Sequence, residues 1–567
     1  MAAGGNGIAA DERFDAVIVG SGFGGAVTAY RLAEAGRRVC ILERGRAYPP
    51  GSFPRDPAGL SRNVWDPTSG LYGMFDLWSF RGLEGLVSSG LGGGSLIYAN
   101  VLIRKPERWF VREDGSDGSY EYWPVTRAQL DPHYDAVEEM LGAQTYPFDA
   151  EPYRATAKTR AMQEAAGRLG LEWELPKLAV TFANPGRKPV PGQVIEGGSR
   201  NLHGADRTTC RLCGECDIGC NYGAKNTLDY TYLSAAQEQG ADIRTLAEVR
   251  RLDPAPGGGY LVTYATHDPA NPRPRSELPT TTLLADRVVL AAGTFGSPYL
   301  LLRNRAAFPA LSRALGTRFC GNGDLLTFIT HASTRVDGKA VPRSLSASFG
   351  PVITSAIRLP DAVEGNGAAG RGSYVEDGGN PAFLGWLLEA ASTPSATARA
   401  ARFAGSRIWA HLTRNPRSRY SAAIADLLGG GTSSSTFLPV LAMGRDVPDG
   451  TMSLRGRDLE VSWSTRTSDA YFDRVEATVA GIARELGGTY LDPLLWLFKR
   501  VVTVHPLGGC PMGRHEGEGV VDDRGEVFGH PGLYVADGSV MPGPVGPNPS
   551  LTIAAFADRV ASGIIDA

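Results

Sequence analysis

The stretch Phe14-Asp-Ala-Val-Ile-Val-Gly-Ser-Gly-Phe-Gly-Gly25 decides the fold of this chain. Residues 14–19 have the pattern of a buried strand, 26–35 that of a helix, and 38–42 that of a second strand ending at Glu43. Gly20, Gly22 and Gly25 form a Gly-x-Gly-x-x-Gly turn, which allows a tight bend and a close approach to a pyrophosphate group. Glu43 stands where an acidic residue accepts bonds from ribose hydroxyls. The unit predicts a Rossmann-like dinucleotide site.

Two distant segments add to this prediction. The strand expected at 532–536 ends in Ala536-Asp537-Gly538, which is similar to the second fingerprint of flavoproteins, where the Asp holds the ribityl–phosphate region of FAD. The strand expected at 286–292 ends in Ala291-Ala292-Gly293-Thr294, which is similar to a third flavoprotein element. Each alone is also compatible with an ordinary buried strand and turn. Together with residues 14–43 they favour FAD over NAD.

Length and composition limit the alternatives. A chain of 567 residues exceeds the size of one hydrophobic core, so at least two domains are expected. The formal net charge of -3 gives no reason to expect a nucleic-acid partner. The sequence contains no run of 18 apolar residues, so no transmembrane segment is predicted. Residues 1–10 carry neither a basic region nor an apolar core, so no signal peptide is predicted and the cytoplasm is the expected location.

Four further segments stand out for their glycines and prolines. They are Gly92-Gly93-Gly94-Ser95, Gly321-Asn322-Gly323-Asp324, His505-Pro-Leu-Gly-Gly-Cys-Pro-Met-Gly513, and Asp537 through Ser550. Together with Gly20–Gly25, these segments resemble the glucose–methanol–choline (GMC) oxidoreductases, and the resemblance covers nearly the whole chain. The segment Gly321–Asp324 suggests the bacterial branch that is similar to cholesterol oxidase.

The resemblance implies an α/β plus α+β architecture, in which a Rossmann-like FAD-binding domain carries an inserted antiparallel-sheet substrate domain. We expect the FAD-binding domain at 12–105, 208–305 and 500–567, and the substrate or cap domain at 106–207 and 306–499. The implied cofactor-binding residues are Gly20, Gly22, Phe23, Gly24, Gly25, Glu43, Arg44, Gly94, Ser95, Asn100, Val249, Gly293, Asp537, Gly538, Pro549 and Ser550.

Alcohol oxidation by a flavin requires a group that takes the hydroxyl proton and a group that fixes the oxygen while hydride leaves for flavin N5. A neutral imidazole suits the first task, and His505 matches the family's base. Asn548 matches the positioning amide; it does not titrate, so it supplies geometry only. The helix expected from Ser550 onward would direct its positive N-terminus at the flavin pyrimidine edge.

Glu376 is a weaker candidate for the base. Some cholesterol oxidases use a Glu from the substrate domain, and Glu376, in Ser373-Tyr-Val-Glu-Asp377, occupies a roughly corresponding region. An exposed loop carboxylate without a catalytic role is the alternative.

Four cysteines crowd into one short segment. Cys210, Cys213, Cys216 and Cys220 follow C-x₂-C-x₂-C-x₃-C, the spacing of ferredoxin-type iron–sulfur ligands. Asn221 replaces the usual Pro and no second set exists, so one cluster on three or four thiolates is the hypothesis. A zinc site or reduced structural thiols are the alternatives. The resemblance adds that some flavin glucose dehydrogenases of the family hold an iron–sulfur cluster in such a segment.

The predicted substrate is a small-molecule alcohol, sterol-like or otherwise bulky, with a sugar or aminoglycoside alcohol as the main rival. The electron acceptor is oxygen, a quinone or a redox protein. Passage through a cluster would make the enzyme a dehydrogenase and not an oxidase. A flavin electron-transfer subunit without alcohol chemistry of its own is a second class. Apolar residues of a helix expected at 383–412 would line a substrate pocket, form core, or form a surface that touches a membrane or a redox partner: Trp386, Leu387, Leu388, Trp409 and Leu412.

Overall fold

The computed structural model describes residues 12–113, 120–379, 436–493, 496 and 499–567. The helix predicted at 383–412, with the five apolar residues named for it, lies outside the described residues. Within the described part, no helix is both long and apolar enough to span a bilayer. The cytoplasmic location stays a prediction.

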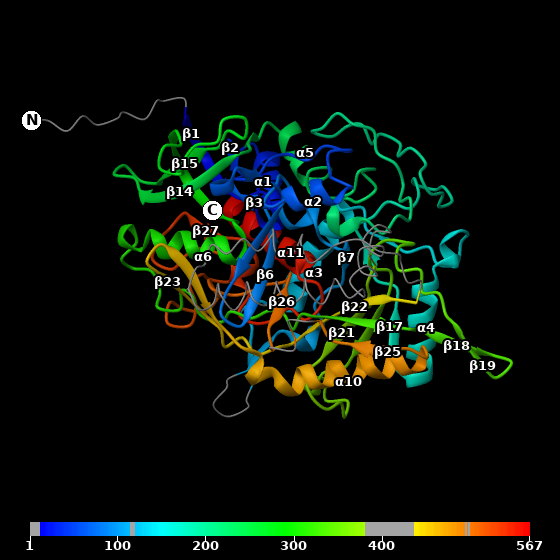
Figure 1. The fold of residues 1–567 in the computed structure, drawn as a ribbon. Coiled ribbons are helices and arrows are strands. Elements are labelled where there is room, and N and C mark those ends of the chain that lie inside the picture. The colour runs from blue at the N-terminus through cyan, green and yellow to red at the C-terminus, as the bar shows by residue number, and fades with distance from the viewer. Residues whose placement is uncertain (1–11, 114–119, 380–435, 494–495, 497–498) are drawn as a thin grey trace, which may run out of the picture.

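The described chain builds two main sheets, which lie one above the other in Figure 1. The upper sheet has seven strands in the order β13-β2-β1-β16-β15-β14, and β27 also pairs with β16. Its parallel strands are β1 (Arg13–Val19), β2 (Val39–Leu42), β13 (Asp242–Arg244), β16 (Thr280–Leu290) and β27 (Leu533–Val535). Its antiparallel strands are β14 (Ala247–Pro254) and β15 (Tyr260–Thr266).

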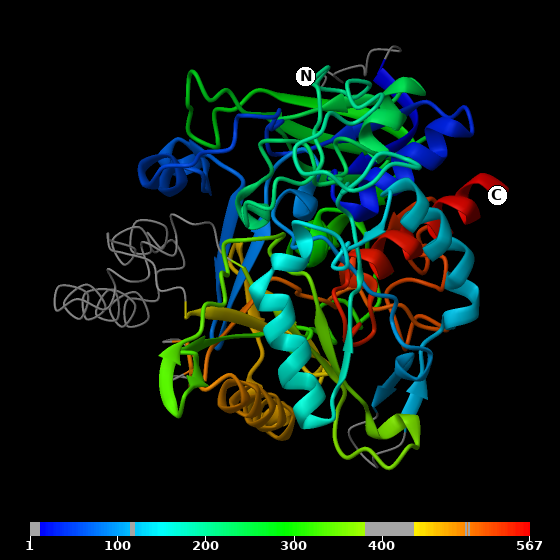
Figure 2. The same ribbon diagram turned by 90° about the vertical axis from the view of Figure 1, so that its right-hand side faces the viewer.

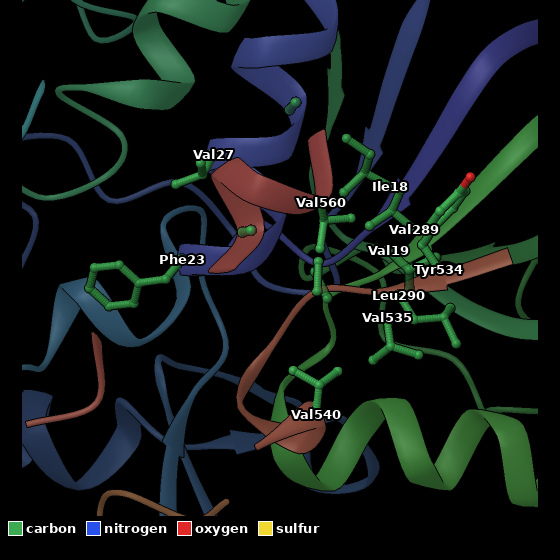
Figure 3. Close-up of a cluster of buried hydrophobic side chains, with 14 of the residues drawn as sticks. Ile18, Val19, Phe23, Val27, Val289, Leu290, Tyr534, Val535, Val540 and Val560 are labelled. Carbon is green, nitrogen blue, oxygen red and sulfur yellow. The ribbon is translucent and has the colours of Figure 1, made fainter. Parts of the chain in front are cut away.

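Apolar runs explain the parallel strands, because strands covered on both faces contain few polar residues. Helix α1 (Phe23–Glu34) packs against α11 (Ser550–Asp566) and α5 (Tyr232–Glu238), and α3 (Arg127–Met140) packs against α11. Figure 3 shows where the two ends of the chain meet in the core, with side chains of β1, β16 and β27 beside those of α1 and α11: Ile18, Val19, Val27, Val289, Leu290, Val535 and Val560.

The lower sheet is antiparallel, in the order β11-β20-β21-β22-β17-β25. Helices α4 (Ala157–Leu169) and α10 (Asp469–Glu485) pack in this lower half, as Figure 2 shows from the side. Its strands are β11 (Glu172–Glu174), β17 (Leu325–Thr330), β20 (Ala356–Leu359), β21 (Ser373–Asp377), β22 (Leu438–Gly444) and β25 (Thr489–Leu491).

A small three-stranded sheet joins a segment near the C-terminus to two strands of the N-terminal part. It consists of β5 (Phe75–Ser79), β6 (Leu83–Ser88) and β26 (Val501–Thr503), with β26 parallel to β6. The other helices are α2 (Pro57–Arg62) and α6 (Gly293–Arg303). The other strands are β3 (Trp65–Asp66), β4 (Leu71–Tyr72), β7 (Val101–Leu102), β8 (Val111–Glu113), β9 (Tyr120–Tyr122), β10 (Gln144–Thr145), β12 (Lys177–Leu178), β18 (Ser333–Val336), β19 (Lys339–Pro342), β23 (Thr451–Arg455) and β24 (Asp458–Ser462).

The segment between α5 and β15 is divided into two strands, β13 and β14. Leu246 has a φ of 57°, in the left-handed region, so the chain turns there. It leaves a parallel pairing with β2 and enters an antiparallel pairing with β15. The domain boundaries stay a prediction; α3, inside the segment assigned to the cap, packs on α11 of the segment assigned to FAD.

Candidate active site

The carboxyl ends of the parallel strands meet around the glycine turn that follows β1. Gly20 has a φ of 97°, and a Cβ there would overlap the carbonyl of Ala291 at the end of β16. A Cβ on Gly24 would overlap the carbonyl of Ala536, which follows β27. These two glycines are therefore required by close packing of three strand ends.

Gly22 and Gly94 are glycines that the protein's own packing does not require. A Cβ at either position has no heavy atom within 4 Å, and neither has a positive φ. The two lie around the same turn, because a Cβ on neighbouring Gly93 would come within 2.6 Å of the Gly22 Cα. The space beside Gly22 and Gly94 thus suits a group that approaches the backbone closely.

Glu43 lies at the end of β2 with its carboxylate turned back to the turn. It accepts hydrogen bonds from the Ser21 amide at 3.0 Å, the Ser21 hydroxyl at 2.7 Å and the Gly45 amide at 2.8 Å. Its neighbour Arg44 forms a salt bridge with Asp76. Glu43 is therefore held at the glycine turn by bonds from Ser21 and Gly45, and Arg44 follows it in the chain.

Asp537 accepts four hydrogen bonds from the protein itself. They come from the Gly293 amide at 2.9 Å, the Ser297 hydroxyl at 2.5 Å, and the amide and hydroxyl of Ser539 at 2.9 and 2.6 Å. A carboxylate offers about four acceptor sites, so these donors saturate Asp537. The resemblance implies a direct hold on the cofactor; in this structure Asp537 instead ties the end of β27, including Gly538, to the start of α6.

Three predicted cofactor residues differ in how their polar atoms are used. Asn100 is buried with a φ of 73°, and both side-chain polar atoms lack a hydrogen-bond partner. The Ser550 hydroxyl, at the start of α11, is also buried without one. The Ser95 hydroxyl is engaged, since it donates to the Gly92 carbonyl and accepts from the Leu228 amide. The Asn100 amide and the Ser550 hydroxyl are therefore available to bond a ligand.

The remaining predicted cofactor residues occupy the same region. Phe23 and Gly25 begin α1, and Pro549 is the N-cap of α11, without a side-chain capping bond. Val249 lies in β14, whose first residue, Ala247, donates its amide to the carbonyl of Glu43.

The loop that carries His505 is bonded to the flavin-side segments. The Thr294 hydroxyl donates to the Pro506 carbonyl at 2.6 Å, and the Gly508 amide donates to the Gly538 carbonyl at 3.1 Å. Leu507 exchanges backbone hydrogen bonds with Cys320. His505 is thereby fixed beside the segments that follow β16 and β27.

Asp324 is the residue that contacts His505 most directly, and sequence reasoning assigned it no role. Its Oδ1 lies 2.7 Å from Nδ1 of His505, and its side chain is fully buried. Its Oδ2 accepts bonds from the amides of Val504 and His505 and from the Thr503 hydroxyl. The only feature of the sequence that could have indicated a role for Asp324 is its place as a polar residue in the glycine-rich run 321–324.

Asn322, two residues earlier, holds the segment that carries Asn548. Its side chain accepts a hydrogen bond from the Gly546 amide at 2.8 Å and donates to the carbonyls of Gly546 and Pro547 at 3.3 and 3.1 Å. One four-residue segment, 321–324, therefore braces both the His505 loop and the Asn548 loop. The structure brings the two predicted catalytic segments together through it.

Glu376 lies in β21 and is fully buried, so its interpretation as an exposed loop carboxylate is wrong. Its Oε2 accepts a hydrogen bond from Nδ2 of Asn548 at 3.3 Å, and its Oε1 has no partner. Burial raises the pKa of Glu376 well above its ordinary value, although the bond from Asn548 opposes the shift. Glu376 thus lies buried beside the amide, where burial favours the neutral form of its carboxyl group.

The four clustered cysteines line one small cavity with a volume of about 20 Å³. Its wall also includes Lys225, Gly350 and Pro351. The loop is held in place by a hydrogen bond from the Gly214 amide to Gly350 and by one from the Gly350 amide to Leu212. The sequence prediction that these cysteines lie together is consistent with this cavity.

The thiols are not arranged around a single point. Among the described residues, no group of three or more His, Cys, Asp or Glu side chains has the geometry of a metal-ion site. Burial raises the pKa of Cys210, Cys213 and Cys216. The buried Lys225 ammonium donates to the carbonyls of Cys216 and Leu96, and burial lowers its pKa to about 8. Cys40 and Cys320, predicted to be core residues, are buried.

Two relatives in sequence and one solved structure are similar to this chain over nearly its whole length. Cholesterol oxidase of Mycobacterium tuberculosis is 31% identical over 97% of this chain and 90% of its own length. Cholesterol oxidase of Acinetobacter baumannii is 28% identical, over 97% of this chain and 94% of its own. Pyridoxine 4-oxidase from Mesorbium loti shares the fold, with a TM-score of 0.58 and 18% identity over 97% of this chain and 98% of its own.

The family models described as GMC oxidoreductase match residues 14–308 at the N-terminal side and 494–557 at the C-terminal side. Both stretches contain segments from which the resemblance was drawn, and the predicted architecture is confirmed. The chain belongs to the GMC oxidoreductases, FAD-dependent enzymes that act on the CH–OH groups of alcohols.

Proposed function

We propose that this enzyme oxidises the CH–OH group of a sterol-like or other bulky alcohol, with His505 as the base and Asn548 as the positioning amide. The observation that carries the proposal is the bracing of both residues by Asn322 and Asp324 beside the strand ends that form the glycine turn. A base and a positioning group held rigidly together are what proton removal from an oriented hydroxyl requires.

The residues present suit FAD. Gly22 and Gly94 leave room where a pyrophosphate and a ring system would approach the backbone, and Asn100 and Ser550 have buried polar atoms without partners. Glu43 keeps one acceptor site at the turn for a ribose hydroxyl. Bound FAD would accept hydride from the carbinol carbon. Asp537 would act by holding the Gly293 and Gly538 segments, because its own oxygens are saturated.

The protein's own residues handle the proton. His505 takes the hydroxyl proton, and the amide of Asn548 fixes the same oxygen, so that the C–H bond keeps one direction. Oδ1 of Asn548 has no partner, and its Nδ2 faces Glu376. Glu376 supports the orientation of the amide through its Oε2, and His505 is the base in this proposal.

Removing the imidazole tests this assignment. His505→Gln should retain flavin and lose anaerobic flavin bleaching by alcohols, by about 10²–10⁴-fold in rate. His331→Gln changes an exposed histidine that hydrogen-bonds only Thr330 among the described residues, and it should behave as the wild type. Bleaching at the wild-type rate in His505→Gln would favour the second class, a flavin electron-transfer subunit.

Similarity to cholesterol oxidases over almost the full chain supports a sterol-like substrate. A sugar or aminoglycoside alcohol is the rival. Anaerobic bleaching with a panel of sterols, long-chain alcohols, sugars and aminoglycosides decides between them, and reoxidation in air then separates an oxidase from a dehydrogenase.

We also propose that the cysteines lining this cavity bind one iron–sulfur cluster. Four thiols surround one space, and the Leu212 amide lies 3.4 Å from Sγ of Cys210, as in N–H···S bonds to bound thiolates. Zinc bound by the same thiols is the alternative. The cluster would carry single electrons to an external acceptor in the cytoplasm.

A further inference from the structure

The turn 321–324 has a feature that bracing alone does not explain. Asp324 uses one carboxylate oxygen for the chain and the other for the imidazole. Its Oδ2 receives the Val504 amide at 2.8 Å, the His505 amide at 3.0 Å and the Thr503 hydroxyl at 3.0 Å. Its Oδ1 receives Nδ1 of His505 at 2.7 Å. The two oxygens therefore have separate tasks.

We propose that Asp324 is a positioning residue that keeps the proton of neutral His505 on Nδ1 and so leaves the Nε2 lone pair facing the substrate. The inference rests on the proposed function, in which His505 is the base. It adds the residue that decides which imidazole nitrogen takes the proton.

The direction of the hydrogen bonds follows from the donor set. Oδ2 accepts from three donors, and hydrogen bonds to a carboxylate favour its charged form. In that form Oδ1 has only lone pairs to offer, so Nδ1 supplies the hydrogen. A neutral imidazole has one N–H, and Nε2 is left as an acceptor. Among the described residues, nothing hydrogen-bonds Nε2.

The segment is rigid enough to enforce this choice. The Gly321 amide donates to Oδ2 of Asp446 at 2.9 Å, and the Tyr471 hydroxyl donates to the Gly323 carbonyl at 2.8 Å. Asn322 is bonded to the chain on the other side. Asp324 cannot turn away without breaking these contacts. When His505 has taken the hydroxyl proton, the buried carboxylate also stabilises the imidazolium.

Other histidines also contact carboxylates, so contact with a carboxylate does not by itself distinguish His505. His133, His203 and His267 contact Asp558, Asp229 and Glu248. None of these carboxylates accepts the backbone amide of its own histidine in the described structure. Asp324 does so, which fixes main chain and ring of His505 together.

Asp324→Asn separates positioning from mere support. The amide oxygen of Asn can keep the three bonds from Thr503, Val504 and His505, and its NH₂ group then faces Nδ1. The ring nitrogen must accept, so the proton moves to Nε2 and the base is blocked. We expect kcat/KM to fall by about 10³-fold or more, with flavin content and Tm retained.

The deciding readout is ¹⁵N NMR of histidine-labelled holoenzyme, with His505 assigned by His505→Gln among the eight histidines. Wild-type His505 should carry its proton on Nδ1, and Asp324→Asn should move it to Nε2. Asp558→Asn is the matched control, because Asp558 contacts the ring of another histidine, His133, and does not touch His505. It should keep the His505 proton on Nδ1 and kcat/KM.

A wild-type proton on Nε2 overturns the inference even if Asp324→Asn does not fold. An unchanged tautomer or unchanged kcat/KM in a folded Asp324→Asn also overturns it. Turnover that survives in His505→Gln refutes the proposed function instead, and leaves the tautomer result standing as a structural fact.

Discussion

Nδ2 of Asn548 lies 3.3 Å from Oε2 of Glu376, although one residue precedes α11 of the FAD side and the other lies in β21 of the lower sheet. The two side chains therefore join the halves of the molecule at the proposed active site. Both are buried, and each keeps one oxygen without a partner. A substrate hydroxyl placed here would meet groups from both sheets.

Glu376→Gln tests whether this carboxyl group is needed as an acid or base. The substitution keeps size and an acceptor for Asn548, while it removes the ionisable proton. We expect kcat/KM to fall by less than about 100-fold, below the loss for His505→Gln, because Gln keeps an acceptor for the Asn548 amide. Rates from anaerobic stopped-flow bleaching provide the comparison, and equal losses in the two variants would make Glu376 a second base.

Gly22→Ala tests the space beside the glycine turn. Gly22 has φ of -69° and ψ of -167°, which alanine adopts readily, and its Cβ would meet no protein atom within 4 Å. The apoprotein should keep its Tm, while FAD binding weakens because the methyl group occupies ligand space. Titration of apoprotein with FAD, followed by flavin fluorescence, measures the change.

Gly24→Ala is the matched control for Gly22→Ala. Its Cβ would overlap the Ala536 carbonyl, so it should lower apoprotein stability by about 1–3 kcal/mol. If Gly22→Ala binds FAD as tightly as the wild type, the pyrophosphate does not approach the turn at this point.

The parallel sheet and its glycine turn could be predicted from the sequence because local signals specify them. An apolar run, a glycine pattern and an acidic residue at a fixed distance leave few alternatives for residues 14–43. His505 and Asn548 were found through motifs of the family, and not through local propensity. The structure then shows why those motifs are rich in Gly: a Cβ on Gly508 would overlap the carbonyl of Arg318.

The bracing residues could not be predicted in the same way. Asn322 and Asp324 act through bonds to residues about 220 and 180 positions away, respectively, and no periodicity encodes such contacts. Glu376 was mistaken for a possible loop residue because its apolar flank is short, although the neighbouring strands bury it completely. Tertiary pairing, which a single sequence does not show, decides both cases.

Asn322→Gly removes the brace of the Asn548 loop without adding strain, because Asn322 has a φ of 54° that glycine tolerates. Loss of the bonds to Gly546 and Pro547 should let Asn548 shift, with a fall in kcat/KM of about 10- to 100-fold. The His505 tautomer should not change. Asn366→Gly, at an exposed position, is the control; equal kcat/KM in the two variants would show that the brace is dispensable.

Cys216→Ser tests the proposed cluster. Anaerobically purified wild type should contain iron and acid-labile sulfide and show charge-transfer absorption beyond that of flavin. The variant should lose at least half of the iron, since serine is a poor ligand for it. Cys40→Ala, in β2 and outside the cavity, should keep the wild-type iron content. Wild type without iron and sulfide would remove the cluster from the proposal.

Asp446 should make stability depend on pH. Burial raises its pKa from 3.8 to about 7, while amide bonds from Gly323 and Gly321 and the charge of Arg371 oppose the shift and Asp324 adds to it. Between pH 4 and 7 the folded state therefore binds more protons than the unfolded state. Its stabilising contribution is present at low pH and is lost as pH rises through about 7, by up to about 1.4 kcal/mol per pH unit.

Asp446→Asn removes this term, because the amide stays neutral at every pH while it keeps an acceptor for the Gly321 amide. The difference in unfolding free energy between wild type and variant should therefore move in favour of the variant as pH rises from 5 to 8. Urea denaturation of the holoenzyme at pH 5, 6, 7 and 8 measures the difference. Parallel curves for the two proteins would mean that Asp446 is ionised across this range, with its charge balanced by the amides of the turn and by Arg371.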